Sequence, residues 1–185
     1  MVDLRVILKQ KFGFDHFRPG QQEILKALLN HEDVLAVLPT GGGKTLLYQL
    51  YAIATHQRVI IVSPLISLMQ DQVSRLQYLG SKRVVALTSA MDFSERRTTL
   101  QHLEQYQFIY ASPEMLSNPQ VSRRLQELSV GLLVVDEAHC ISEWGPDFRP
   151  DYLKLGAVRK ALKQPLTLMM TATATQRTRN DIIDK

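Results

Sequence analysis

The chain has 185 residues, of which 45% are hydrophobic and 22% are charged. This is the composition of a globular domain that can bury a full core, and we expect one domain over residues 1–185. No apolar run approaches the length of a membrane span, and the first residues lack the basic-then-apolar layout of a signal peptide, so we expect neither a membrane protein nor an exported one.

The cysteine count and the net charge limit further which class of protein the chain can be. Cys140 is the only cysteine, so a disulfide framework or a thiolate zinc site within the chain is excluded. We expect it to be a small buried residue of a protein in a reducing cytoplasm. The formal charge of +4 permits a polyanionic partner such as nucleic acid but does not require one.

Residues 1–30 have the apolar spacing of two helices around a turn. The turn contains three phenylalanines, Arg18 and Gln21. An aromatic or guanidinium plane can stack on a purine, and a glutamine amide can pair with an adenine edge. Equally, the phenylalanines can be core residues and Gln21 a solvated helix start, and the residues alone favour this second interpretation.

The apolar run 34–37 is followed by a glycine-rich turn and then by a helical pattern over 46–51. Consecutive glycines allow several backbone N–H groups to point into one concavity, and a helix N-terminus adds its own. A chance glycine turn is the alternative, and Leu38 stands where the general phosphate-loop pattern has its first glycine. Lysine and threonine after the turn suit a nucleotide triphosphate with Mg²⁺. We expect the phosphates at Thr40, Gly41, Gly42, Gly43, Lys44 and Thr45.

Short apolar runs alternate with helical patterns along the rest of the chain. This alternation predicts an α/β fold with a doubly wound, mostly parallel sheet covered by helices on both faces, with ligands at the carboxyl ends of the strands. The expected strands are 34–37, 58–62, 84–87, 108–111, 132–135 and 166–170. The expected helices after 46–51 are 65–79, 94–103, 120–128, 152–162 and one from about 175.

Two acids, Asp136 and Glu137, directly follow the expected strand 132–135. Beside a phosphate loop, the first acid suits the Mg²⁺ shell and the second suits polarisation of the attacking water. Without the glycine turn, the pair would be a solvated turn. His139 can be a capping or surface histidine, but its place two residues after the proposed base favours a polar relay.

Together these segments resemble the first RecA-like domain of superfamily-two helicases, and residues 12–21 and 138–152 resemble the RecQ family closely. The resemblance runs from about Leu8 to Asp181 and implies binding of ATP and Mg²⁺. It implies adenine recognition by Phe14, Arg18 and Gln21, phosphate binding by Gly41 to Thr45, and Mg²⁺ and water activation by Asp136 and Glu137.

The resemblance also implies contacts with single-stranded DNA. It places Trp144, Phe148 and Arg149 in an aromatic-rich loop that senses the strand, and a Gly145–Pro146 breaker agrees with a loop, although core aromatics are the alternative. Other segments are implied to line the DNA path or couple it to the nucleotide. These are Ser63, Pro64, Ser112, Pro113, Thr171 and Thr173.

The resemblance implies an ATP-dependent DNA helicase that moves 3′ to 5′ and acts at single strands and duplex junctions in a bacterial cytoplasm. Such a motor needs a second RecA-like domain with an arginine finger, and none fits after Met170. We therefore expect an isolated first motor domain. The alternatives are a module that binds ATP and single-stranded DNA without turnover, an RNA helicase domain, or another P-loop enzyme such as a nucleotide kinase.

Overall fold

The structure is a computed structural model that describes residues 3–142 and 147–184. Within these ranges six strands form one sheet in the order β1-β6-β5-β2-β4-β3, and every neighbouring pair is parallel. The predicted α/β class is confirmed, and a strand forms at each of the six expected places. The strands are β1 Val34–Val37, β2 Val59–Val62, β3 Val84–Leu87, β4 Phe108–Ala111, β5 Leu132–Val135 and β6 Leu166–Thr171.

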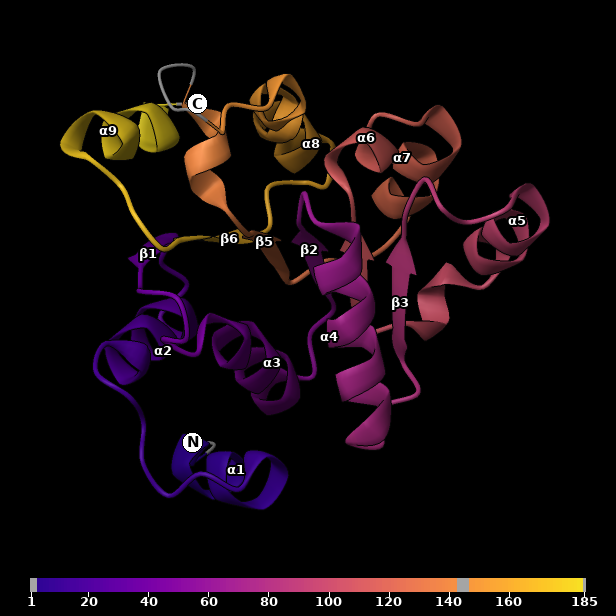
Figure 1. Ribbon diagram of the computed structural model, residues 1–185. Helices are drawn as coiled ribbons and strands as arrows, with labels where there is room; N and C mark the ends of the chain where they lie inside the picture. Colours follow the sequence, from indigo (N-terminus) through magenta and orange to yellow (C-terminus); the bar gives the residue numbers. More distant parts are fainter. Residues whose placement is uncertain (1–2, 143–146, 185) are drawn as a thin grey trace.

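Helices cover both faces of the sheet (Figure 1). One face carries α1 Leu4–Phe12, α2 Gln21–Leu29, α3 Lys44–Thr55 and α4 Ile66–Tyr78. The other face carries α5 Phe93–Gln101, α6 Pro113–Leu116, α7 Pro119–Gln126, α8 Leu155–Ala161 and α9 Gln176–Asp184. Short 3₁₀ turns lie at Leu103–Gln105, Ala138–Ile141 and Pro150–Lys154.

The largest differences from the sequence prediction are one helix that starts later and one short helix that was not expected. The helix expected from Tyr152 begins at Leu155, because Pro150 starts a 3₁₀ turn that occupies 150–154. The short helix α6 was not predicted, since its four residues are too few to show a helical period. Proline at its first position, after Ser112, suits a helix start.

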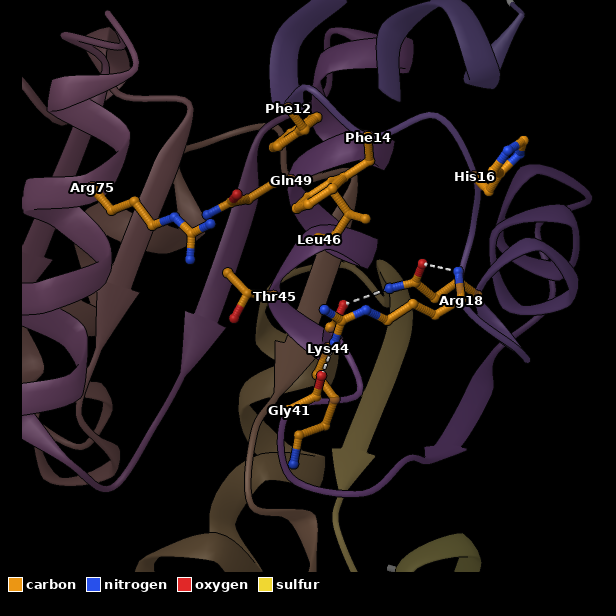
Figure 2. Close-up of a pocket in the computed structure, with 12 residues that line it drawn as sticks. Phe12, Phe14, His16, Arg18, Gly41, Lys44, Thr45, Leu46, Gln49 and Arg75 are labelled. Atoms are coloured by element: carbon orange, nitrogen blue, oxygen red, sulfur yellow. Dashed lines mark hydrogen bonds between the residues drawn. The ribbon is translucent and has the colours of Figure 1, made fainter. Parts of the chain in front are cut away.

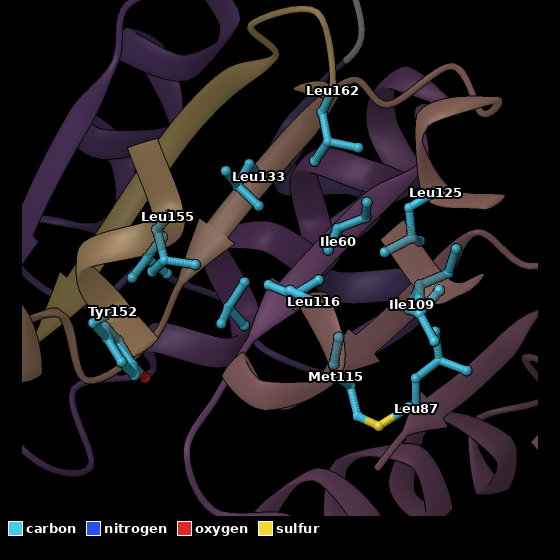
Figure 3. Close-up of a cluster of buried hydrophobic side chains, with 14 of the residues drawn as sticks. Ile60, Leu87, Ile109, Met115, Leu116, Leu125, Leu133, Tyr152, Leu155 and Leu162 are labelled. Atoms are coloured by element: carbon cyan, nitrogen blue, oxygen red, sulfur yellow. The ribbon is translucent and has the colours of Figure 1, made fainter. Parts of the chain in front are cut away.

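The strands are almost entirely apolar because both of their sides are covered, and β6 alone among them contains polar residues, Thr167 and Thr171. Alternate residues of each strand point to opposite layers: Ile60 and Val62 pack with α5 to α8, whereas Val59 and Ile61 pack with α1 to α4. Figure 3 shows the first of these layers, where Ile60, Ile109 and Leu133 from three neighbouring strands meet Leu116 and Leu125.

The parallel registers bring all six ends of the described strands to one edge of the sheet, including Leu87 of β3, which pairs with Ala111. Val37 pairs with Thr171, and Val62 pairs with both Ala111 and Val135. The segments that follow these residues therefore meet at the carboxyl edge, where ligands of doubly wound sheets bind. None of the described helices is long and apolar enough to cross a membrane.

Candidate active site

The glycine turn between β1 and α3 has the backbone that its sequence requires. Gly41 and Gly43 both adopt φ +77°, in the left-handed region that favours glycine. A Cβ atom on Gly42 would lie 2.8 Å from the carbonyl oxygen of Pro39, and one on Gly43 would lie 2.3 Å from Nε2 of Gln21. A larger residue at 42 would therefore collide with the backbone of the turn, and one at 43 would be strained at the N-cap of α3.

Gln21 braces this turn from the start of α2. Its side chain is 1% exposed, and its Nε2 donates to the carbonyl oxygens of Gly42 and Gly43 at 3.3 and 3.2 Å. Its Oε1 accepts from the backbone N–H of Arg18 at 2.9 Å, and the Arg18 guanidinium donates to the carbonyl of Gly41 (Figure 2). The segment before α2 is thus tied directly to the phosphate loop.

These contacts correct part of the sequence prediction. The residues alone favoured Gln21 as a solvated helix start, and this interpretation is wrong, because the side chain is buried. The amide that the resemblance assigned to adenine is engaged with the turn instead, so in this structure it holds the loop's shape. A direct contact of Gln21 with adenine stays a prediction.

A pocket of about 360 Å³ opens beside the loop. Phe14, whose side chain is 42% exposed, lines it together with Arg18, and the start of α3 forms its floor. Gln49 and Arg75 lie at the far side from Arg18 (Figure 2). An exposed aromatic ring and a guanidinium at one pocket are the groups that stack on a purine base.

The acidic pair lies at the end of β5, across the sheet edge from the loop. The backbone N–H of Asp136 donates to the carbonyl of Val62 at 2.9 Å, which continues the parallel ladder to the first acid. The Tyr152 hydroxyl donates to the Asp136 carbonyl at 2.9 Å. Glu137 has φ +51°, a left-handed conformation that is uncommon for a residue with a side chain and is found at functional sites.

Burial changes the acid–base behaviour of the first acid. Burial, and then the charge of Glu137, raise the pKa of Asp136. A hydrogen bond from the Glu137 backbone and the electrostatic effects of Lys44 and His139 oppose this shift. A carboxylate that is costly to keep charged gains most from a cation placed beside it. The environment of Asp136 therefore suits a carboxylate that binds a cation.

His139 connects the second acid to the last strand. Its Nδ1 lies 3.3 Å from Glu137 Oε2 and 3.0 Å from Thr171 Oγ1, and its Nε2 lies 3.6 Å from Asp147 Oδ2. The Thr171 hydroxyl also donates to the carbonyl of Thr173 at 2.9 Å. A histidine at the surface would not make these contacts. The contacts are those that a polar relay needs.

The phosphate loop and the acids face one small cavity of about 170 Å³. Two of its polar wall atoms, the Ser63 hydroxyl and the Gln72 side-chain oxygen, are buried without a hydrogen-bond partner in the described part of the chain. Buried polar groups are nearly always paired, so the cavity fits a polar occupant. Oxygen donors are what Mg²⁺ prefers. The cavity is lined by Thr40, Gly41, Lys44, Thr45, Tyr48, Ile61, Ser63, Leu68, Met69, Gln72, Tyr110, Asp136 and Glu137.

Several hydroxyls expected along a DNA path are buried. Ser63 and Ser112, which directly follow β2 and β4, are 3% and 1% exposed, and Thr171, the last residue of β6, is 0% exposed. Pro113 is buried as well, whereas Pro64 is half-buried and Thr173 is exposed. Direct DNA contact by the buried hydroxyls is therefore not supported by this structure, and a coupling role for them stays a prediction.

The aromatic-rich loop is described only at its end. Trp144 lies outside the described residues, and its DNA contact stays a prediction. Phe148 is half-buried, and Arg149 is exposed, with its backbone N–H donating to the Cys140 carbonyl at 3.0 Å. Cys140 is 2% exposed, as expected, and burial raises the pKa of its thiol.

Sequence reasoning missed several residues that line the site, among them Tyr48 and Tyr110. Both look like ordinary core aromatics in an apolar helix and strand, yet both line the cavity. A signal was present for Tyr48, which follows Thr45 by three residues and therefore shares its face of α3. Tyr110 had no such signal, because only the fold brings β4 beside α3.

The comparison with known families agrees with this arrangement of loop and acids. A family model for DEAD/DEAH box helicases matches residues 18–182, and the chain belongs to that family.

Its curated relatives are DNA helicases of the RecS and RecQ type. The chain is 50% identical over 184 residues to the probable ATP-dependent DNA helicase RecS of Bacillus subtilis, covering 100% of this chain and 37% of RecS. It is 38% identical over 186 residues to the ATP-dependent DNA helicase RecQ of Haemophilus influenzae, covering 96% of this chain and 29% of RecQ. The predicted resemblance is confirmed, and the chain spans about a third of the length of these relatives.

Solved structures support the RecA-like helicase fold. A hypothetical ATP-dependent RNA helicase from Sulfolobus tokodaii superposes with a TM-score of 0.76 at 19% identity, over 100% of this chain and 54% of that one. At this identity the likeness concerns the fold alone.

Proposed function

We propose that the chain is the ATP-binding first motor domain of a RecQ-like DNA helicase. The observation that carries the proposal is the shared cavity, where Lys44 and Thr45 of the phosphate loop face Asp136 and Glu137 of the acidic pair. Phosphate on one side and paired acids on the other are the two halves that ATP hydrolysis needs. The similarity to RecS and RecQ favours DNA as the partner.

Each group has a defined part in this proposal. The loop amides and Lys44 hold the phosphates, and Phe14 and Arg18 hold the base. The Thr45 hydroxyl and the Asp136 carboxylate would hold Mg²⁺, which would neutralise charge on the phosphates. Glu137 accepts the proton of the attacking water, and His139 holds the Glu137 carboxylate in place through its Nδ1 contact.

The chain alone should hydrolyse ATP slowly. Among the described residues no arginine lines the cavity between the loop and the acids. An arginine finger contributes about 10³–10⁵ in the rate of phosphoryl transfer. We propose that a second RecA-like domain of a longer protein supplies it, and that this pair of domains moves 3′ to 5′ along single-stranded DNA and opens duplex junctions in a bacterial cytoplasm.

Phosphate release from the chain, with and without single-stranded DNA, tests the proposal. We expect measurable ATP binding, turnover near background and no unwinding of a forked duplex. Lys44→Ala should abolish ATP binding without lowering the melting temperature, because the lysine is half-buried and lines the cavity rather than packing in the core. Robust DNA-stimulated turnover by the chain alone would contradict the half-motor, and unchanged ATP affinity in Lys44→Ala would contradict the nucleotide site.

An RNA helicase domain is the second candidate, since the match to the DEAD/DEAH box helicase family does not distinguish DNA from RNA. Matched DNA and RNA oligomers separate the two, since a 2′-hydroxyl is what distinguishes the strands. We expect tighter binding of the DNA oligomer.

A further inference from the structure

One buried amide beside the nucleotide pocket has no partner. Gln49 of α3 is 3% exposed, and its side-chain nitrogen Nε2 forms no hydrogen bond within the described part of the chain. Burying an amide N–H without a partner is unfavourable, and such groups are rare in folded proteins. An unpaired amide in this place therefore indicates a partner from outside the chain.

The unpaired amide belongs to the wall of the 360 Å³ pocket that we assign to the base. Gln49 lines this pocket together with Phe14 and Arg18, and Figure 2 shows it across the pocket from Arg18. Four buried side-chain atoms of the described residues lack a partner, and the Gln49 nitrogen is the only one of them in a residue that lines this pocket. The missing partner is therefore expected to be the occupant of the pocket.

The Tyr110 hydroxyl is the candidate partner within the chain. Burial raises the pKa of Tyr110 to about 12, and the neighbouring Tyr48 hydroxyl and Gln49 amide oppose this shift, so the amide lies near the phenol. However, no hydrogen bond joins the Gln49 nitrogen to this hydroxyl, whose oxygen lies 3.1 Å from the hydroxyl oxygen of Tyr48. The phenol thus has its own partner, and the amide remains available to the pocket.

The position of Gln49 along α3 suits contact with a base rather than with a phosphate. Gln49 follows Lys44, the first residue of the helix, by five residues, which is roughly 7.5 Å along the helix axis. It also follows Thr45 by four residues, so the two side chains share the face of α3 that lines the pocket. Phosphates held at the start of the helix therefore lie more than one turn away from the amide.

A carboxamide is complementary to one edge of adenine. Its N–H donates and its carbonyl accepts, while the 6-amino group of adenine and the ring nitrogen beside it offer the opposite pair. Gln21 lines the same pocket, but its Nε2 donates to the loop carbonyls and its Oε1 accepts from the Arg18 backbone. Gln49 is thus the glutamine of this pocket whose amide nitrogen is free to pair with a base.

We propose that Gln49 is a specificity-determining residue that reads the adenine edge, with Nε2 donating to a ring nitrogen and Oε1 accepting from the 6-amino group. This inference rests on the proposed function of the pocket as an ATP site. The bound base supplies the partner that the amide lacks in the free chain. A purine without the 6-amino group leaves Oε1 without its donor and binds more weakly.

Gln49→Met removes both hydrogen-bonding groups at similar side-chain length, and Leu46→Met is the matched control. Leu46 lies on the same helix, is 8% exposed and lines the same pocket, and the change to methionine conserves its volume. For each chain, calorimetry gives the affinity for ATP and for purine riboside triphosphate, which carries hydrogen in place of the 6-amino group. The ratio of the two affinities is the amino-group preference. A thermal melt of the nucleotide-free chain reports the fold.

We expect the wild type to prefer ATP about threefold to tenfold, the size of one net hydrogen bond. Gln49→Met should bind ATP about tenfold more weakly and show no preference, whereas Leu46→Met should keep the wild-type preference. The melting temperature of Gln49→Met should stay the same or rise, because the variant removes an unpaired buried group. An amide with a purely structural role, such as a partner of Tyr110, would lower the melting temperature and leave the preference unchanged.

Three results overturn the inference. They are equal binding of ATP and the analogue by the wild type, a preference that persists in Gln49→Met, and an equal loss of preference in Leu46→Met. The first result needs no variant, so it decides even if Gln49→Met does not fold. A wild-type chain that binds neither nucleotide contradicts the proposed function of the pocket, and the role of Gln49 with it.

Discussion

Substitution of Gln21 distinguishes a residue that braces the phosphate loop from one that reads the base. Gln21→Ala removes three hydrogen bonds, two to the loop carbonyls and one from the Arg18 backbone. Each contributes about 0.5–1.5 kcal/mol net, and the two loop bonds are long, so we expect a loss of about 2 kcal/mol in the free energy of unfolding. For a domain of this size that lowers the melting temperature by about 4–8 °C.

The nucleotide preference decides between the two roles. A brace shapes the loop for any triphosphate, so ATP and GTP should weaken together, by about tenfold, with their ratio unchanged. A base reader would lose its preference for ATP, and the melting temperature would hardly change. Fluorescence titration with both nucleotides measures the ratio, and Gln22→Ala, at the half-buried neighbouring position, is the control. A collapse of the ATP-to-GTP ratio in a variant of normal stability would refute the brace.

Two further substitutions test the acids and the aromatic loop. Asp136→Asn should abolish Mg²⁺-dependent ATP binding yet raise the melting temperature of the nucleotide-free chain at neutral pH, because burial raises the pKa of Asp136 and makes its charged form costly. Since that cost disappears once the acid is protonated, the gain should vanish as the pH falls through the raised pKa, and a gain that persists in acid would contradict this cause. Trp144→Ala should weaken binding of a single-stranded oligonucleotide by about 1–3 kcal/mol, measured by anisotropy, with little change in stability. A stability loss of about 3–5 kcal/mol instead would place Trp144 in a core.

The sequence predicted the sheet well because local and global signals agree there. Each strand is a short apolar run such as 132–135, bounded by turn residues. A strand that is buried on both faces is recognised by such a run and needs no alternation of polar and apolar residues. The prediction of helices is less accurate where a proline or a short length hides the helical period of apolar residues, as before Leu155 and in α6. The phosphate loop and the acid pair could be proposed from the sequence because their chemistry depends on residues that are neighbours in sequence.

Polar residues that act by being buried were harder to predict. Gln21 and Tyr110 carry no local sign that their partners lie 21 and 62 residues away. Burial of such groups is costly unless each is paired, so their positions depend on the finished fold rather than on the segment that contains them. A motif can therefore indicate that a segment matters while leaving the role of its side chain open.

The buried strand-end hydroxyls show the same limit from the other side. Successive side chains of a strand point to opposite layers. Ser63 continues this alternation one residue after β2, and Thr171 continues it as the last residue of β6. Their hydroxyls therefore face the interior, and on the last segment the exposed residue is Thr173. Thr171 joins the carbonyl of this residue to His139, and His139 contacts Glu137. A strand of DNA resting on Thr173 would thus be three polar contacts from the proposed base, and we predict that the buried Thr171 hydroxyl transmits such a contact rather than making it.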